Sequence, residues 1–140
     1  MAVDLAPPFR DLEFMTPLSG SHVDRLVKFA ATDRVVVDVG CGWAELLLRV
    51  VAAEPRGCGL GIDLDEVAIG HGRDLARERG LVGRVELRIG DAREAFPDEI
   101  GSIICVGASQ IWGSQVQEGH PLDYRAALRA LRKPLAVGGR

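Results

Sequence analysis

The chain has 140 residues, a formal net charge of −3 and 47% hydrophobic residues, which predicts one globular domain with one core and argues against a disordered chain. Its basic residues are scattered among acidic ones, so no nucleic-acid partner is expected. No apolar run reaches the ~18 residues of a membrane span, and the N-terminus lacks a signal-peptide pattern, so we expect a cytoplasmic protein without membrane contact.

The first half of the chain predicts an arm followed by a helix, a strand and a second helix. Residues 1–18 contain three prolines and no clear periodicity, which indicates an irregular arm before a domain over residues 19–140. Residues 19–31 predict a helix with Ser21 as its N-cap. The run over 34–40 contains four valines, and they are continuous rather than alternating, as in a strand buried on both faces of a parallel sheet. A helix is expected next, ended by Pro55.

The same alternation continues to the end of the chain. Strands are expected over 58–63, 84–91 and 102–109, and helices over 65–80, 92–99 and 124–134, with a polar loop over 110–121. Asp65 is the expected cap of the first of these helices and Gly80 its end. Alternating strands and helices predict βαβ units, and therefore an α/β fold with helices on both faces of a parallel sheet.

The cysteines indicate neither cross-links nor a metal. Cys41, Cys58 and Cys105 are far apart, and no C-x-x-C pair occurs. This spacing argues against a disulfide framework and against a zinc site. We expect small buried side chains in a reducing compartment, and no metal site.

The glycine turn after the first strand carries the strongest chemical signal. It runs Gly40-Cys41-Gly42-Trp43-Ala44-Glu45, with Asp38 two residues before it. A dinucleotide fingerprint would need a third glycine where Glu45 stands, and the Gly-Lys-Ser/Thr of a phosphate-binding loop is absent. Carboxylates at Asp38 and Glu45 would repel phosphate. The turn therefore predicts a positively charged ligand without phosphate, and both carboxylates disfavour a nicotinamide dehydrogenase.

The segment Asp38-Val39-Gly40-Cys41-Gly42 resembles motif I of the class I methyltransferases, which bind S-adenosylmethionine. That cofactor carries an ammonium and a sulfonium and has no phosphate. The resemblance implies cofactor contacts at Asp38, Gly40 and Gly42. Ala44 stands where the family pattern has its last glycine. Trp43 is bulkier than the family's usual residue, and two positions for it remain open, over the cofactor or packed outward.

Three further segments follow in the family's order and imply the rest of the cofactor site. GIDLDEVAI resembles the second-strand motif, in which Asp63, followed by Leu64, accepts hydrogen bonds from the ribose hydroxyls. RIGDAREA resembles the third-strand motif, in which Asp91 accepts from the adenine amino group and the Ala92 N–H donates to the ring. SIICVGAS resembles the fourth-strand motif, with Gly107 near the methionine end. The resemblance implies a Rossmann-like doubly wound sheet with strand order 3-2-1-4.

The resemblance implies an S-adenosylmethionine-dependent methyltransferase, and the text over residues 15–29 is similar to the helix that precedes motif I in enzymes with small-molecule acceptors. The strand-four text lacks the signature of enzymes that methylate amino groups of DNA bases. His22 and His120 are weak candidates for a general base, and an ordinary surface role remains open for each.

A second hypothesis is a non-catalytic cofactor-binding fragment or interaction module. Family members continue with further strands, which are absent from this sequence, so we expect a domain that is incomplete at its C-terminus. The fourth strand would then be an apolar exposed edge. A partner, a second copy of the chain or a missing C-terminal half would be needed to cover it.

Overall fold

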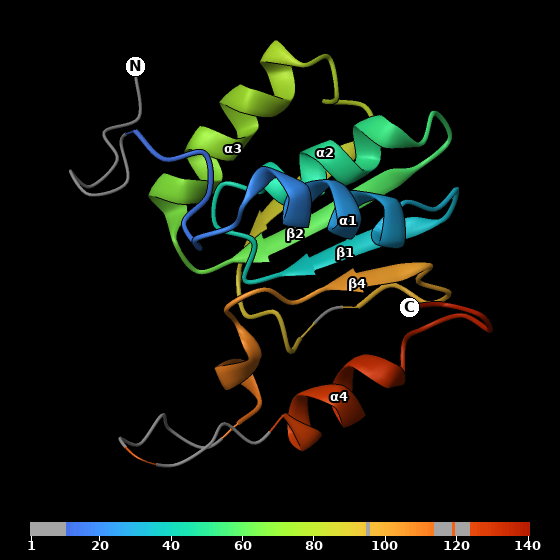
Figure 1. Cartoon of the computed structure of the whole chain (residues 1–140). Coiled ribbons are helices and arrows are strands. Elements are labelled where there is room, and N and C mark those ends of the chain that lie inside the picture. Colours follow the sequence, from blue (N-terminus) through green and yellow to red (C-terminus); the bar gives the residue numbers. More distant parts are fainter. Residues whose placement is uncertain (1–10, 95, 114–118, 120–123) are drawn as a thin grey trace.

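Four parallel strands form one sheet, in which the third strand of the chain is followed by the second, the first and the fourth, as predicted. The structure is a computed structural model, and it describes residues 11–94, 96–113, 119 and 124–140. The strands are β1 (Val35–Val39), β2 (Cys58–Asp63), β3 (Val85–Ile89) and β4 (Ser102–Ile104). They run side by side across the middle of the molecule in Figure 1, with β1 between β2 and β4.

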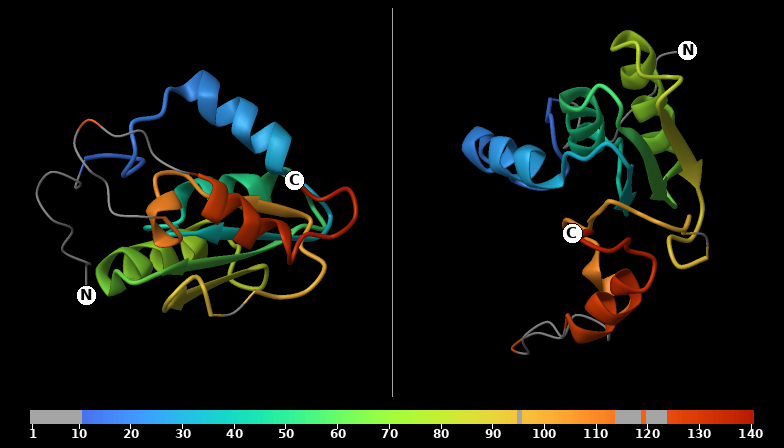
Figure 2. Two further views of the ribbon diagram at one scale, coloured as in Figure 1. Left: turned by 90° about the horizontal axis from the view of Figure 1, so that it is seen from below. Right: turned by 90° about the vertical axis from the view of Figure 1, so that its right-hand side faces the viewer.

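The helices lie on both faces of this sheet. On one face are α1 (Gly20–Ala30), α2 (Glu45–Ala53) and α3 (Glu66–Glu78). On the other face, α4 (Arg125–Arg132) lies beyond β4 (Figures 1 and 2). The core has two parts accordingly, one between the sheet and the first three helices and one on the α4 side. Among the described residues, no helix has both the length and the apolar character that crossing a membrane requires.

Close packing of α2 on the sheet explains why β2 contains glycines. A Cβ at Gly59 would lie 2.8 Å from side-chain atoms of Leu47 and Val51. A Cβ at Gly61 would lie 2.7 Å from Leu87 and 2.9 Å from the sulfur of Cys41. These glycines therefore bring the helix and the sheet close together, which places the turn before α2 against the end of β2.

Three local predictions need correction. Ser19, not Ser21, is the N-cap of α1, because its backbone is extended and its hydroxyl accepts from the His22 N–H at 3.3 Å. The described residues of 92–99 form turns and bends rather than a helix. Pro97 has no N–H to donate, so it disfavours the hydrogen bonds of a helix there. The fourth strand ends at Ile104, and the chain then bends into a short 3-10 helix over Ser109–Ile111.

The outer edge of β4 is partly covered by residues 135–140, so it is less exposed than expected. The Arg140 N–H donates to the Gly101 oxygen at 3.1 Å, and the Ile103 N–H donates to the Arg140 oxygen at 2.8 Å. This pair of bonds is the pattern of a parallel ladder. The Ala136 N–H adds a bond to the Ile100 oxygen at 2.9 Å.

Candidate functional site

The turn between β1 and α2 is held in a conformation that favours glycine. Gly40 and Gly42 have φ values of 66° and 56°. The N–H groups of Gly40 and Cys41 both donate to the Ile62 oxygen, at 2.8 and 3.2 Å, which ties the turn to the end of β2. A Cβ at Gly40 would lie 2.5 Å from the Cβ of Ala108, so this position requires glycine for both reasons.

Ala44 shares this left-handed conformation, with φ 63° and ψ 24°, and stands directly before α2. The family's glycine would adopt it without strain, whereas an alanine in the left-handed region is strained by roughly 1–2 kcal/mol. The departure from the family pattern therefore leaves the shape of the turn intact, at an energetic cost to the chain.

The Asp63 carboxylate is fixed at the end of β2. Its Oδ2 accepts from the Gly42 N–H at 2.7 Å, and its Oδ1 accepts from the Asp65 N–H at 2.9 Å. Asp65 separately caps α3, as predicted, by accepting from the N–H groups of Val67 and Ala68. Each Asp63 oxygen keeps further acceptor capacity, so the oriented carboxylate can accept from two neighbouring hydroxyls of a sugar.

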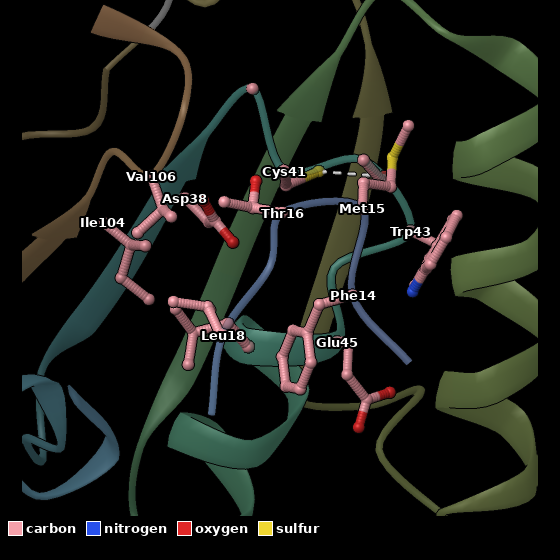
Figure 3. A pocket seen from close by; sticks show the side chains of 13 residues that line it. Phe14, Met15, Thr16, Leu18, Asp38, Cys41, Trp43, Glu45, Ile104 and Val106 are labelled. Atoms are coloured by element: carbon pink, nitrogen blue, oxygen red, sulfur yellow. Dashed lines mark hydrogen bonds between the residues drawn. The ribbon is translucent and has the colours of Figure 1, made fainter. Parts of the chain in front are cut away.

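Two adjoining pockets lie at the carboxyl ends of the strands. The larger has a volume of about 450 Å³ and the smaller about 70 Å³, and they share five lining residues. Asp38 lines the smaller pocket, which Figure 3 shows from close by. The structure brings all eight residues of the predicted cofactor site to these pockets: Asp38, Gly40, Gly42, Asp63, Leu64, Asp91, Ala92 and Gly107. This is the edge where parallel α/β sheets bind ligands.

Asp38 is the most perturbed carboxyl group of the site. Only 5% of the residue is exposed. Burial, followed by the nearby charge of Asp63, raises the pKa of Asp38 to about 8. A cation placed beside it would stabilise the ionised form and lower this pKa. Burial also raises the pKa of the Cys41 thiol, with contributions from Asp38 and Asp63, so Cys41 stays neutral near pH 7.

The negative charge of Glu45 is not free to repel a phosphate in the way that its position in the sequence suggests, because two arginines pair with it. Its carboxylate pairs with Arg49 at 2.7 Å and with Arg79 at 2.7 Å. Burial works to raise the pKa of Glu45, but hydrogen bonds from Arg79 and Arg49 outweigh it and lower the pKa. Figure 3 shows this carboxylate directed away from Asp38. Two guanidinium groups thus compensate its charge, and Asp38 and Asp63 are the carboxylates that face the turn.

Asp91 has a partner that the sequence did not suggest. Its carboxylate forms an ion pair with Arg93, and its Oδ1 also accepts from the Arg93 N–H at 2.9 Å. Hydrogen bonds from the Arg93 side chain and backbone lower the pKa of Asp91 to about 2. Asp91 is therefore ionised across the physiological range and can accept from an amino group.

Further lining residues escaped sequence reasoning. Met15 and Thr16, from the predicted irregular arm, line both pockets, and Arg93 and Val106 also contribute. No local pattern marks these positions, because only the fold brings the arm to the turn. Of the two histidine candidates, His22 lines a separate surface groove beside α1, and His120 lies outside the described residues.

Comparison with known proteins finds similarity to methyltransferases. The profile of the family described as "Methyltransferase domain" matches residues 36–139. The curated protein "Methyltransferase ungE'" from Aspergillus campestris is 38% identical over 65 residues, which are 46% of this chain and 19% of the fungal protein.

Solved structures with the same fold include two bacterial proteins described as SAM-dependent methyltransferases in complex with S-adenosyl-L-homocysteine. The one from Thiobacillus denitrificans is 23% identical with a TM-score of 0.77, covering 97% of this chain and 54% of its own. The one from Geobacter sulfurreducens is 23% identical with a TM-score of 0.76, covering 99% and 54%. This chain thus spans about half of their length. Since the family profile matches most of the chain, the chain belongs to the methyltransferase domain family.

Proposed function

We propose that this chain forms the cofactor-binding part of an S-adenosylmethionine-dependent methyltransferase that transfers a methyl group to a small-molecule acceptor. The observation that carries the proposal is the fixed Asp63 carboxylate, which accepts from the Gly42 N–H at 2.7 Å beside the glycine turn. The relatives bound to S-adenosyl-L-homocysteine support it. So does the buried Asp38, which suits a cation better than a phosphate.

The residues present fit this cofactor. Asp63 would hold the ribose hydroxyls, and the ionised Asp91 would accept from the adenine amino group while the Ala92 N–H donates to the ring. Gly40 and Gly42 carry no side chains, so a ligand can approach the main chain of the turn closely. Leu64 and Gly107 line the larger pocket.

When bound, S-adenosylmethionine supplies an electrophilic methyl group on its sulfonium. The protein has to bind it, orient it toward the acceptor and exclude water. Orientation of two reactants can contribute ~7–11 kcal/mol to lowering a barrier, so a general base is not required. Val106, Ala108 and Ile111 give the larger pocket an apolar wall, which strengthens the interactions of Asp63 with polar ligand groups.

Titration calorimetry with S-adenosylhomocysteine tests the proposal. We expect saturable binding by the wild-type chain and a loss of at least about tenfold in affinity for Asp63→Ala, since hydrogen bonds to a charged group contribute ~1.5–3 kcal/mol each. Asp24→Ala, an exposed aspartate on α1, is the matched control and should bind like wild type. No heat from the wild-type chain, or equal affinity of Asp63→Ala and wild type, would reject the proposal.

A second candidate is a cofactor-binding module that needs a covering partner or a longer chain before it can transfer a methyl group. The short pairing of Arg140 with β4 favours it. Ile104 pairs with Asp38 of β1 on the inner side, but among the described residues the outer edge beyond Ile103 has no ladder partner. A homodimer or a second protein could pair there. Saturable binding without turnover, together with concentration-dependent association in light scattering, would support this candidate, and turnover by a monomer would reject it.

The remaining parts of the proposal concern organisation and location. We assign residues 1–18 to an arm and residues 19–140 to the domain. The free cysteines Cys41, Cys58 and Cys105 are consistent with a reducing compartment and support a cytoplasmic location.

A further inference from the structure

The described part of the arm lies across the pockets rather than away from them. Residues 11–18, here called the strap, form no helix or strand. Phe14, Met15, Thr16 and Leu18 nevertheless line the smaller pocket, and Figure 3 shows them around Asp38 and Cys41. Phe14 and Leu18 also pack against the core beneath α1 and α2. Side chains that pack in this way hold an irregular segment in place.

The strap reaches both sides of the larger pocket. The Met15 sulfur lies 2.5 Å from the place where a Cβ on Gly42 would stand. The Thr16 hydroxyl lies 3.1 Å from the equivalent place on Gly107. Gly42 follows β1 and Gly107 follows β4, so two consecutive strap residues span the mouth between the strand ends.

Trp43 and Arg49 fix the strap from the side of the turn and α2. The Trp43 indole N–H donates to the Glu13 main-chain oxygen at 2.8 Å. The Arg49 guanidinium pairs with the Glu13 carboxylate at 3.1 Å and lies over the Phe14 ring at 5.1 Å. Three contacts therefore converge on Glu13 and Phe14 from the turn and the helix that carry the site.

Both side chains are themselves held by the fold. Trp43 is 3% exposed and meets the His71 ring edge-on at 5.7 Å. Arg49 is oriented by Glu45 through its Nε at 2.7 Å. This resolves the open position of the bulky Trp43, which is buried between the strap and α3.

We propose that Trp43 and Arg49 are positioning residues that latch the strap over the cofactor pocket, with Met15 and Thr16 as its outer wall, so that release of the cofactor requires the strap to lift. The wall part rests on the proposed function, since it needs S-adenosylmethionine or its product in the larger pocket. The latch part stands on contacts of the ligand-free chain alone. Opening the latch would speed dissociation of the bound product.

Two variants remove the latch from opposite sides. Trp43→Phe keeps an aromatic ring and removes the indole N–H, and Glu13→Lys places a repelling charge beside Arg49. Trp112→Phe and Glu86→Lys are matched controls. Trp112 stacks on Phe96 and lines neither pocket. Glu86 forms an exposed ion pair with Arg88 on β3, much as Glu13 does with Arg49.

The experiment combines hydrogen exchange of the strap with the dissociation rate of S-adenosylhomocysteine. In the ligand-free chain, the strap amides should exchange faster than in wild type in both latch variants. In both controls they should exchange at the wild-type rate. The dissociation rate constant should rise about three- to tenfold in the latch variants, the range expected for one lost hydrogen bond. Glu13→Lys, which alters an exposed side chain, keeps the test valid if Trp43→Phe fails to fold.

Each result decides one part. Unchanged strap exchange in Glu13→Lys overturns the latch. Faster exchange with an unchanged dissociation rate overturns the wall, because the strap would then be mobile without gating the pocket. If the wild-type chain binds no S-adenosylhomocysteine, the proposed function and the wall fail together, while the exchange data still decide the latch.

Discussion

Burial and the proposed function place opposite demands on Asp38, because burial favours its neutral form and binding of a cation favours its ionised form. It follows two buried valines in β1, where an aliphatic side chain would pack without cost. With a pKa raised to about 8 by burial and by Asp63, it is mostly protonated near pH 7 in the ligand-free chain. A ligand cation would restore the charge, so binding would be linked to release of a proton.

This linkage predicts that the affinity for S-adenosylhomocysteine falls as the pH is lowered from 8 to 6, by at most about tenfold per pH unit. Below pH 8 the Asp38 carboxyl group must lose its proton before it can form an ion pair with the ammonium group of the ligand. Asp38→Asn should bind more weakly at pH 8 and lose most of the pH dependence. Calorimetry in buffers of different ionisation enthalpy would detect the released proton, and a flat affinity profile for wild type would contradict the prediction.

The same shift predicts an opposite dependence of stability on pH. The folded pKa of Asp38, about 8, is above its value of 3.8 in an unfolded chain, so the folded state binds the proton more tightly. Its contribution to stability is present in full below pH 3.8 and is lost as the pH rises through 8. We expect the melting temperature of the ligand-free wild type to fall between pH 6 and pH 9 more than that of Asp38→Asn. Equal slopes for the two proteins in scanning calorimetry would speak against a buried, protonated Asp38.

At the scale of the elements, the turn after β1 is wedged between α3 and the sheet. A Cβ on Gly72 of α3 would lie 2.6 Å from the Trp43 oxygen and 2.9 Å from the Leu87 side chain. Glu45 at the start of α2 also pairs with Arg79 at the end of α3. The position of Trp43, and through it that of the strap, therefore depends on how closely α3 approaches.

Gly72→Ala tests this close approach. Alanine normally stabilises a helix relative to glycine by ~1 kcal/mol. Here we expect a loss of about 1–3 kcal/mol, because the new methyl group meets main-chain atoms that cannot rotate away. Gly20→Ala at the start of α1, where the new Cβ meets nothing within 4 Å, is the matched control. Urea unfolding should show the control as neutral or more stable, and equal behaviour of the two variants would exclude the wedge.

The elements also show what the sequence could and could not predict. Continuous apolar runs predict the individual strands, since each run has a local pattern. The strand order came from the resemblance to the class I methyltransferases, which the glycine turn and the three later segments carry. The helix cap was placed at Ser21 instead of Ser19 because both serines have the chemistry of a cap, and only the backbone distinguishes them. The contact between Glu13 and Trp43 joins an irregular segment to a turn 30 positions away, and no periodicity encodes such a contact.

At the scale of the whole molecule, the C-terminal segment joins the β4 edge to the end of α1. The Arg140 guanidinium donates to the Phe29 oxygen and, at 2.9 Å, to the Ala31 oxygen, and it lies over the Phe29 ring at 5.8 Å. A cation at the carboxyl end of a helix satisfies free carbonyl groups and complements the helix dipole. The same residue pairs with β4 through its main chain, so residues 135–140 both cover the sheet edge and anchor α1.

Deletion of residues 135–140 should therefore convert a covered edge into a surface for self-association. The main-chain groups of Ile100, Gly101 and Ile103 would lose their partners, and an unpaired apolar edge templates pairing with another chain. We expect the deletion variant to show a larger apparent mass than wild type in light scattering, with a steeper concentration dependence. Arg140→Ala, the control, keeps the main-chain pairs and should associate like wild type while losing about 1 kcal/mol of stability through its side-chain contacts. Circular dichroism has to show that the deletion variant is folded. An unchanged mass in a folded deletion variant would mean that the edge is protected by something other than residues 135–140.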